Sequence, residues 1–248
     1  MISVFEKEVY EWNSRRKLWH FGGCVLMIAI YFLWQDLTLF GGRLNGLTVL
    51  LAFAWGETAL CLAVDIICFY SAYYRQRKTS LFGFRHIMRA HEAKGFNAST
   101  YYLFGSAVLL TFCFFGFCRE EILVMAILVL GIADPAAALV RWQFDKRARR
   151  NERAWGLLAF IAAGSLVICL VAWYYQSPLT WPQIFCIAAG TAMVETYTKN
   201  WVAFVRPVTR RVQNAIRHRM TEWTFIFWPD DNLTTQLAVA VLAVIFIR

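Results

Sequence analysis

The amino-acid sequence predicts an all-α fold, a polytopic transmembrane helical bundle of about seven spans, with residues 1–248 in a single integral membrane domain. Three observations predict it: the composition, the length of the apolar segments and the placement of charge. Hydrophobic residues make up 59% of the 248 residues and charged residues only 17%, whereas a soluble domain has about 25% charged residues. This composition excludes an ordinary soluble enzyme, a disordered protein and a disulfide-stapled secreted module.

The apolar segments are long enough to cross a bilayer. A helix needs about 20 mostly apolar residues to span a hydrocarbon core of roughly 30 Å. The first segment is not a signal peptide, because a charged stretch precedes it and no small-residue cleavage pattern follows. No internal repeat divides the chain. The predicted spans are residues 18–36, 44–70, 100–117, 122–142, 154–173, 181–198 and 233–247.

Charge placement orients these spans. Of the 25 Lys and Arg residues, 22 lie in the N-terminal arm and in segments 71–99, 141–153 and 199–219, all on one side; the others are Arg43, Arg119 and Arg248. Because positive loops stay inside, this predicts a cytoplasmic N-terminus in a multi-pass protein of a bacterial inner membrane or the endoplasmic reticulum. The basic rim predicts contact with anionic lipids at the cytoplasmic face. Charge spread over four loops argues against nucleic acid as a partner.

The seven cysteines do not predict a metal site or a disulfide framework. Most of them lie within apolar runs and show no Cys-x-x-Cys spacing. We interpret these as small buried hydrophobic residues. They are Cys61, Cys68, Cys113, Cys169 and Cys186.

Ionisable residues inside the spans are few, and such residues mark function or a buried ion pair because they are costly in lipid. With the predicted orientation, most of them lie toward the cytoplasmic leaflet, and only Glu57 is near mid-membrane. This convergence is the main functional indication in the sequence. The others are His20, Asp65, Asp134 and Glu195, joined by Asp230, Asp231 and Asn232 at the start of the last span.

Two segments concentrate this polarity. In residues 131–141, Pro135 cannot donate to the carbonyl of Gly131, which weakens the helix beside Asp134, and Asp134 shares a face with Arg141 seven residues later. This pattern fits a kinked packing helix with an internal ion pair, or a carboxylate that holds Mg²⁺ on a phosphate with Arg141 beside it. In residues 15–23, Arg16, Lys17 and His20 share one helical face. Alone, that face would be a basic membrane anchor with a satisfied histidine.

The segment 89–105 enters the third span. Asn97, Ser99 and Thr100 are candidate helix caps, and the N–H groups at such a helix start can also bind an anion. Both interpretations remain open from the sequence. No P-loop, GxGxxG, HExxH, GxSxG or zinc-binding spacing occurs in the chain.

At these residues the chain resembles the polyprenol kinase family, which covers dolichol kinase, phytol kinase and CTP-dependent diacylglycerol kinase and is distantly related to phosphatidate cytidylyltransferases. The similar motifs follow the family order over most of the chain. They are Arg16-Lys17-x-x-His20-x-x-Gly23, Arg89-x-His91-Glu92 leading to Thr100-Tyr-Tyr-Leu-x-Gly105, Gly131-x-x-Asp134-x-Ala-Ala-Ala-x-x-Arg141, Glu195, and Asp231-Asn232-Leu-Thr234.

The resemblance implies a CTP-dependent lipid kinase, a phosphotransferase that uses Mg²⁺ and transfers a phosphoryl group from CTP to the hydroxyl of a membrane lipid alcohol at the cytoplasmic leaflet. It implies catalytic roles for Asp134, His20 and Glu195, with Asp134 and Asp231 as metal ligands. It assigns nucleotide binding to Arg16, Lys17, Arg141, Glu152, Asp231 and Asn232. It assigns the acceptor or loop site to Arg89, His91, Glu92, Asn97 and Thr100.

The chain departs from the family in two places. The family has Gly and Ser after the glutamate of a nucleotide-contacting stretch, and here Glu152 is followed by Arg-Ala-Trp. In addition, a basic segment, residues 206–228, has the pattern of an amphipathic helix on the membrane surface, or of a plain lipid-anchoring extension. Two other functions therefore stay open: a cytidylyltransferase that makes a CDP-lipid, and a non-catalytic lipid-binding or transport protein. A transporter would have polar groups along the whole membrane depth.

The predicted orientation has a direct test. Cysteines introduced by Lys146→Cys and Arg210→Cys should react with a membrane-impermeant maleimide only from the cytoplasmic side, because both positions lie in basic loops. Labelling of both from the outer side would reverse the orientation.

Overall fold

The computed structural model describes residues 14–34, 38–39, 44–71, 74, 96–145, 152–198 and 230–247. These form seven helices and one small antiparallel sheet. The predicted acceptor residues Arg89, His91 and Glu92, the side chain of Glu152 and the segment 206–228 lie outside what the structure describes, as do Lys146 and Arg210.

The all-α prediction is confirmed, and a helix lies at each predicted span with ends that differ by a few residues. In the sheet, β1 (Thr38–Leu39) pairs with β2 (Leu44–Asn45), with Thr38 opposite Asn45. The helices are α2 (Ser14–Trp34), α3 (Gly46–Tyr70), α5 (Ala98–Phe114), α6 (Glu120–Asp145), α7 (Glu152–Tyr174), a helix over residues 181–198, and α9 (Asp231–Phe246).

Four of these helices are long and apolar enough to cross a membrane, which indicates a multi-pass membrane protein. They cover Ser14–Trp34, Gly46–Cys68, Glu120–Phe144 and Ala154–Tyr174. Helices α5 and α9 are apolar but shorter. Large apolar side chains are exposed along α2, α3 and α7, and an exposed apolar surface of this extent suits lipid rather than water.

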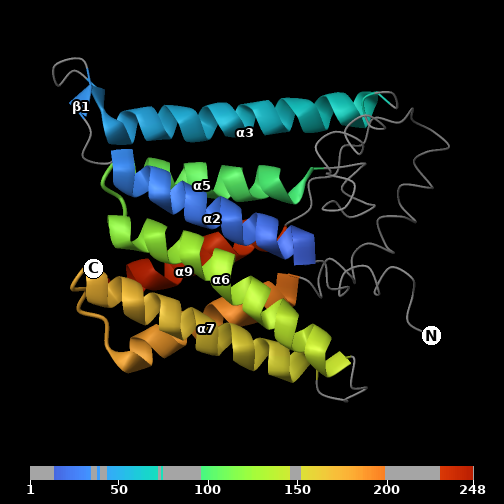
Figure 1. Ribbon diagram of the computed structural model, residues 1–248. Helices are drawn as coiled ribbons and strands as arrows, with labels where there is room; N and C mark the ends of the chain where they lie inside the picture. Colours follow the sequence, from blue (N-terminus) through green and yellow to red (C-terminus); the bar gives the residue numbers. More distant parts are fainter. Residues whose placement is uncertain are drawn as a thin grey trace, which may run out of the picture.

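Helix α6 is the centre of the bundle. Successive helices in Figure 1 run in alternating directions, so their ends gather at two opposite ends of the molecule. Helix α6 packs against α7, α9 and α2, while α5 packs against α3 and α9. In the first half of α6, every residue from Glu121 to Ile127 is buried. The chain continues as one helix through Pro135, so the local weakening expected there does not end it.

Polar contacts join α9, α5 and α2 inside the bundle. The Gln236 amide donates to Ser106 Oγ at 3.2 Å and to the Tyr102 carbonyl at 3.4 Å, and the Tyr102 hydroxyl donates to the Gly23 carbonyl at 3.4 Å. A Cβ at Gly105 would lie 2.2 Å from Gln236 Oε1, so a larger residue there would displace the Gln236 amide from this contact. Interhelical hydrogen bonds of this kind contribute about 0.6–2 kcal/mol each in membranes.

The turn between α5 and α6 is set by one glycine. Gly116 has φ +74°; its N–H donates to the Cys113 carbonyl at 3.0 Å, and the Phe117 N–H donates to the Phe112 carbonyl at 2.8 Å. The Phe112 and Phe117 rings pack edge to face, with centroids 6.2 Å apart. These two bonds and the apolar contact form a Schellman motif, which satisfies the last carbonyls of α5.

We therefore expect Gly116→Ala to destabilise the protein by about 1 kcal/mol. A side chain in the left-handed region costs about 1–2 kcal/mol. Part of this cost is offset because alanine loses less conformational entropy on folding than glycine does. The melting temperature in detergent should fall by about 2–4 °C. Gly56→Ala is the matched control: that position is helical, with nothing within 4 Å of an added Cβ, and it should not lose stability. Equal melting temperatures for the two variants would contradict this account of the turn.

Candidate active site

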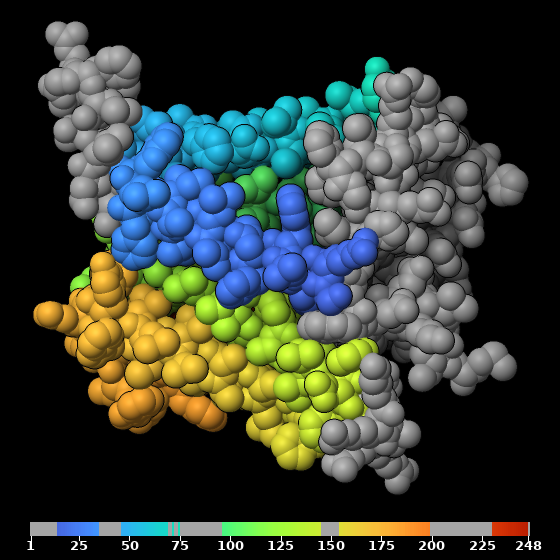
Figure 2. Space-filling view, viewed as in Figure 1, coloured from blue at the N-terminus to red at the C-terminus, as the bar shows by residue number. Residues whose placement is uncertain are grey.

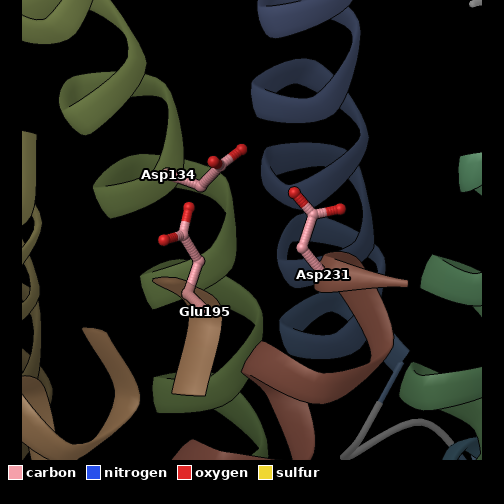
Figure 3. A group of neighbouring side chains, drawn as sticks. All are labelled: Asp134, Glu195 and Asp231. Carbon is pink, nitrogen blue, oxygen red and sulfur yellow. The ribbon is translucent and has the colours of Figure 1, made fainter. Parts of the chain in front are cut away.

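Three carboxylates from three different helices meet near one end of the bundle. Asp134 lies on α6, Glu195 on the helix over residues 181–198, and Asp231 is the first residue of α9. One oxygen from each lies within 4.8 Å of the others, and Figure 3 shows the three side chains around a common point. Asp134 is 3% exposed and Glu195 is 2% exposed. The three residues are far apart in the sequence, and the packing of their helices brings them together.

The start of α9 is fixed by its cap. Asp230 is the N-cap, and its Oδ1 accepts from the Asn232 backbone N–H at 2.9 Å and from the Asn232 side-chain amide at 2.6 Å. The Asn232 amide also reaches the Ala98 carbonyl on α5 at 3.5 Å. Asp231 thus sits in the first turn, where the helix dipole favours a negative charge. The capping role of Asp230 went unrecognised in the sequence, although an aspartate before an apolar helix is a common N-cap.

Two cations pair directly with this carboxylate cluster. The Lys17 ammonium contacts Asp134 Oδ2, and an Arg141 guanidinium nitrogen donates to Glu195 Oε1 at 3.3 Å. Arg141 also interacts electrostatically with Asp134 and Asp231. Each ion pair brings together two helices, and each lowers the cost of keeping a charged group away from water.

A glycine on α7 makes room for Arg141. A Cβ on Gly156 would lie 2.3 Å from Arg141 Cγ, so the arginine stem passes over Gly156 in direct contact with the α7 backbone. Helix α6 alone therefore does not orient the guanidinium; α7 supports it from behind. This contact could not be inferred from the spacing of Asp134 and Arg141.

The basic face of α2 lies beside the same cluster. His20 is partly buried and interacts electrostatically with Arg16, Lys17, Asp134 and Asp231. Arg16 is 5% exposed. The sequence predicts that Arg16, Lys17 and His20 share one face of α2. The structure adds that this face borders carboxylates of α6 and α9.

A fourth carboxylate, Asp65, serves α5 instead. Asp65 Oδ2 accepts from the Asn97 backbone N–H at 2.9 Å and from the Thr100 hydroxyl at 2.5 Å. Asn97 is the N-cap of α5 and accepts from the Ser99 N–H at 3.2 Å, while the Thr100 and Tyr101 N–H groups donate to the Asn97 carbonyl. These donors at the helix start already have partners, which favours the capping interpretation over anion binding.

The structure thus gathers part of the predicted site. It gathers Lys17, Arg141 and His20 around the carboxylates of Asp134, Glu195 and Asp231, with Arg16 beside His20 on α2. It places Asn97 and Thr100 in contact with Asp65 at the start of α5. Asn232 is 2% exposed and ties α9 to α5. The open alternative of an ion pair between Asp134 and Arg141 is replaced by a direct contact of Arg141 with Glu195.

The donor set suits a hard divalent cation. Its three carboxylates offer only oxygen ligands, which Mg²⁺ and Mn²⁺ prefer, whereas zinc sites are built mainly from thiolates and imidazoles. Asp134, Glu195 and Asp231 therefore fit Mg²⁺, and the predicted metal pair of Asp134 and Asp231 gains Glu195 as a third ligand candidate. Comparisons with protein-family models, curated proteins and solved structures found no match to this chain.

If these carboxylates hold Mg²⁺, the ion should stabilise the purified protein against heat. A Mg²⁺ concentration about 100-fold above its Kd should raise the free energy of unfolding by about 2.7 kcal/mol. Asp134→Asn should remove the Mg²⁺-dependent rise in melting temperature, since it deletes a ligand charge while keeping the side-chain volume.

Asp65→Asn is the matched control, because Asp65 is equally buried but contacts α5. That variant should lose stability and keep the Mg²⁺-dependent rise measured from its own metal-free baseline. A rise of the same size in the Asp134 variant would place the metal elsewhere.

Proposed function

We propose that the protein is a CTP-dependent lipid-alcohol kinase that phosphorylates the hydroxyl of a dolichol or other polyprenol, a phytol or a diacylglycerol at the cytoplasmic leaflet. The single observation that supports this most is the meeting of Asp134, Glu195 and Asp231 beside cationic Lys17 and Arg141. These residues come from the same motifs that resemble the polyprenol kinase family. Their order along the chain and their convergence in space are independent arguments for one site.

The charges suit a metal–nucleotide substrate. A bound Mg²⁺ would neutralise part of the charge on the phosphates and on the transferred phosphoryl group. Arg16, Lys17 and Arg141 are the nearby cations that bind phosphate oxygens in this proposal. On binding, phosphates compete with Asp134 for Lys17 and with Glu195 for Arg141, which leaves both carboxylates available to the metal.

The lipid acceptor reaches the site from the side of α2. Leu18, Trp19 and Phe21 are exposed apolar residues in the same turns as Lys17 and His20. Figure 2 shows α2 in blue on the molecular surface, between α3 and the helices α6 and α7. An acceptor chain that lies along this apolar surface carries its hydroxyl to the polar turn of α2. Anionic lipids at the basic rim hold the protein at the same depth.

His20 is the group that positions the acceptor hydroxyl or accepts its proton. Phosphoryl transfer with a largely dissociative transition state asks little of a base, so positioning carries most of the effect. An imidazole beside Asp134 and Asp231 has hydrogen-bonding capacity for either task.

The reaction is tested with CTP labelled in either the γ- or the α-phosphate, Mg²⁺, and a mixture of polyprenol, phytol and diacylglycerol in detergent micelles. We expect label in the lipid from γ-labelled CTP alone, because a kinase transfers only the terminal phosphoryl group. Label from α-labelled CTP would instead identify a cytidylyltransferase, whose acceptor is a lipid phosphate; that arm therefore includes phosphatidate. Absence of label in both arms would favour the lipid-binding or transport alternative.

His20→Ala should lower the maximal rate by about 10²-fold, the scale of general acid–base groups, with little change in the apparent affinity for CTP. His20→Gln keeps a hydrogen-bonding group of similar reach, so recovery of the rate in this variant identifies positioning, and no recovery identifies proton transfer. An unchanged rate in the alanine variant would leave His20 as a packing residue. Asp65→Asn, assayed at a temperature where it is folded, controls for general loss of structure.

A further inference from the structure

Two thiols face each other at the end of the bundle opposite the carboxylates. Cys113 is the penultimate residue of α5, and Cys118 lies in the turn that leads to α6. Their Sγ atoms are 2.8 Å apart, well inside the usual separation of two non-bonded sulfur atoms. Both are free thiols, and each is partly exposed.

The backbone, rather than side-chain flexibility, holds this pair together. The Gly116 turn reverses the chain, and the Phe117 N–H donation to Phe112 draws residue 118 back over the last turn of α5. Sulfur contacts follow the same path: Cys118 Sγ lies 3.9 Å from the Leu109 carbonyl and Cys113 Sγ lies 3.7 Å from the Arg119 carbonyl. The Schellman motif therefore presents the two thiols to each other before any bond forms.

The location favours oxidation. The turn lies on the side that carries only three of the 25 basic residues, which by the charge rule is the non-cytoplasmic side. The periplasm and the lumen of the endoplasmic reticulum are both oxidising compartments. The contact with Cys113 also lowers the pKa of the Cys118 thiol below its ordinary value, and the thiolate is the form that attacks a disulfide.

We propose that Cys113 and Cys118 form an intramolecular disulfide that closes the turn between α5 and α6 on the non-cytoplasmic side. The oxidant is the disulfide of a thiol–disulfide oxidoreductase in that compartment. The Cys118 thiolate attacks it to give a mixed disulfide, and the Cys113 sulfur then displaces the donor. One S–S bond forms in the protein, two protons and two electrons leave, and the donor becomes a dithiol.

This proposal assigns Cys113 a role other than that of a small buried hydrophobic residue. It is independent of the proposed kinase activity and rests on the predicted orientation. Its structural consequence is a covalent link that fixes α5, which carries the Thr100 contact to Asp65, at the start of α6, which carries Asp134.

The test uses the full-length protein in its own membrane. Cells are quenched in acid, all free thiols are alkylated with a light maleimide under denaturing conditions, and the protein is then reduced and alkylated with a heavy maleimide. The tryptic peptide that contains both residues reports their state. We expect both Cys113 and Cys118 to carry the heavy label. Light label on both, or heavy label on only one, would overturn the proposal.

Matched variants separate this bond from other pairings. In Cys113→Ser, Cys118 should carry the light label, because its partner is gone; heavy label there would show that Cys118 is bonded elsewhere and would overturn the proposal. Cys186→Ser, a change at an exposed cysteine on another helix, should leave the heavy label on both residues. Reduction should lower the melting temperature of the wild-type protein and leave that of Cys113→Ser unchanged.

Discussion

The need to compensate buried carboxylates organises this protein. Asp134 and Glu195 are almost fully buried among apolar helices, where an isolated charge is too costly to keep. Each has a cation from a distant part of the chain: Lys17 of α2 for Asp134, and Arg141 of α6 for Glu195. These pairs fix α2 and the helix over residues 181–198 against α6, and Gly156 brings α7 against Arg141. The same groups are the ones a metal–nucleotide substrate would engage, so packing and proposed chemistry share one set of residues.

Much of the fold could be predicted from the sequence because a segment that crosses a bilayer must be long, apolar and helical. Apolar runs of about 20 residues, separated by basic loops, leave few alternatives to a helical bundle. The helix starts were less certain, since caps such as Asn97 and Asp230 require knowing which donor each side chain meets. The family resemblance placed Asp134, Glu195 and Asp231 in one site before any geometry was known.

The pairing of charges could not be predicted. Lys17 and Asp134 are 117 residues apart, and Arg141 and Glu195 are 54 apart, so no local pattern links them. Spacing within α6 pointed to Arg141 as a neighbour of Asp134 and gave no reason for Glu195. Asp65 shows the reverse case: it matches no motif, and its role in holding α5 follows from its contacts with Asn97 and Thr100.

The unequal helix lengths have a consequence for the surrounding bilayer. Helix α5 has 17 residues and α6 has 26, and the short turn between them keeps their ends level on one side. Helix α6 therefore continues from Asp134 to Asp145, about 16 Å at 1.5 Å per residue, past the level where α9 begins at Asp231. With α5 and α9 each near 25 Å by the same rise, both helices are shorter than the hydrocarbon core, and local thinning of the bilayer is one way in which a membrane accommodates such short spans. Thinning there would bring the headgroup region closer to the carboxylates, which is the approach that the proposed transfer to a lipid hydroxyl requires.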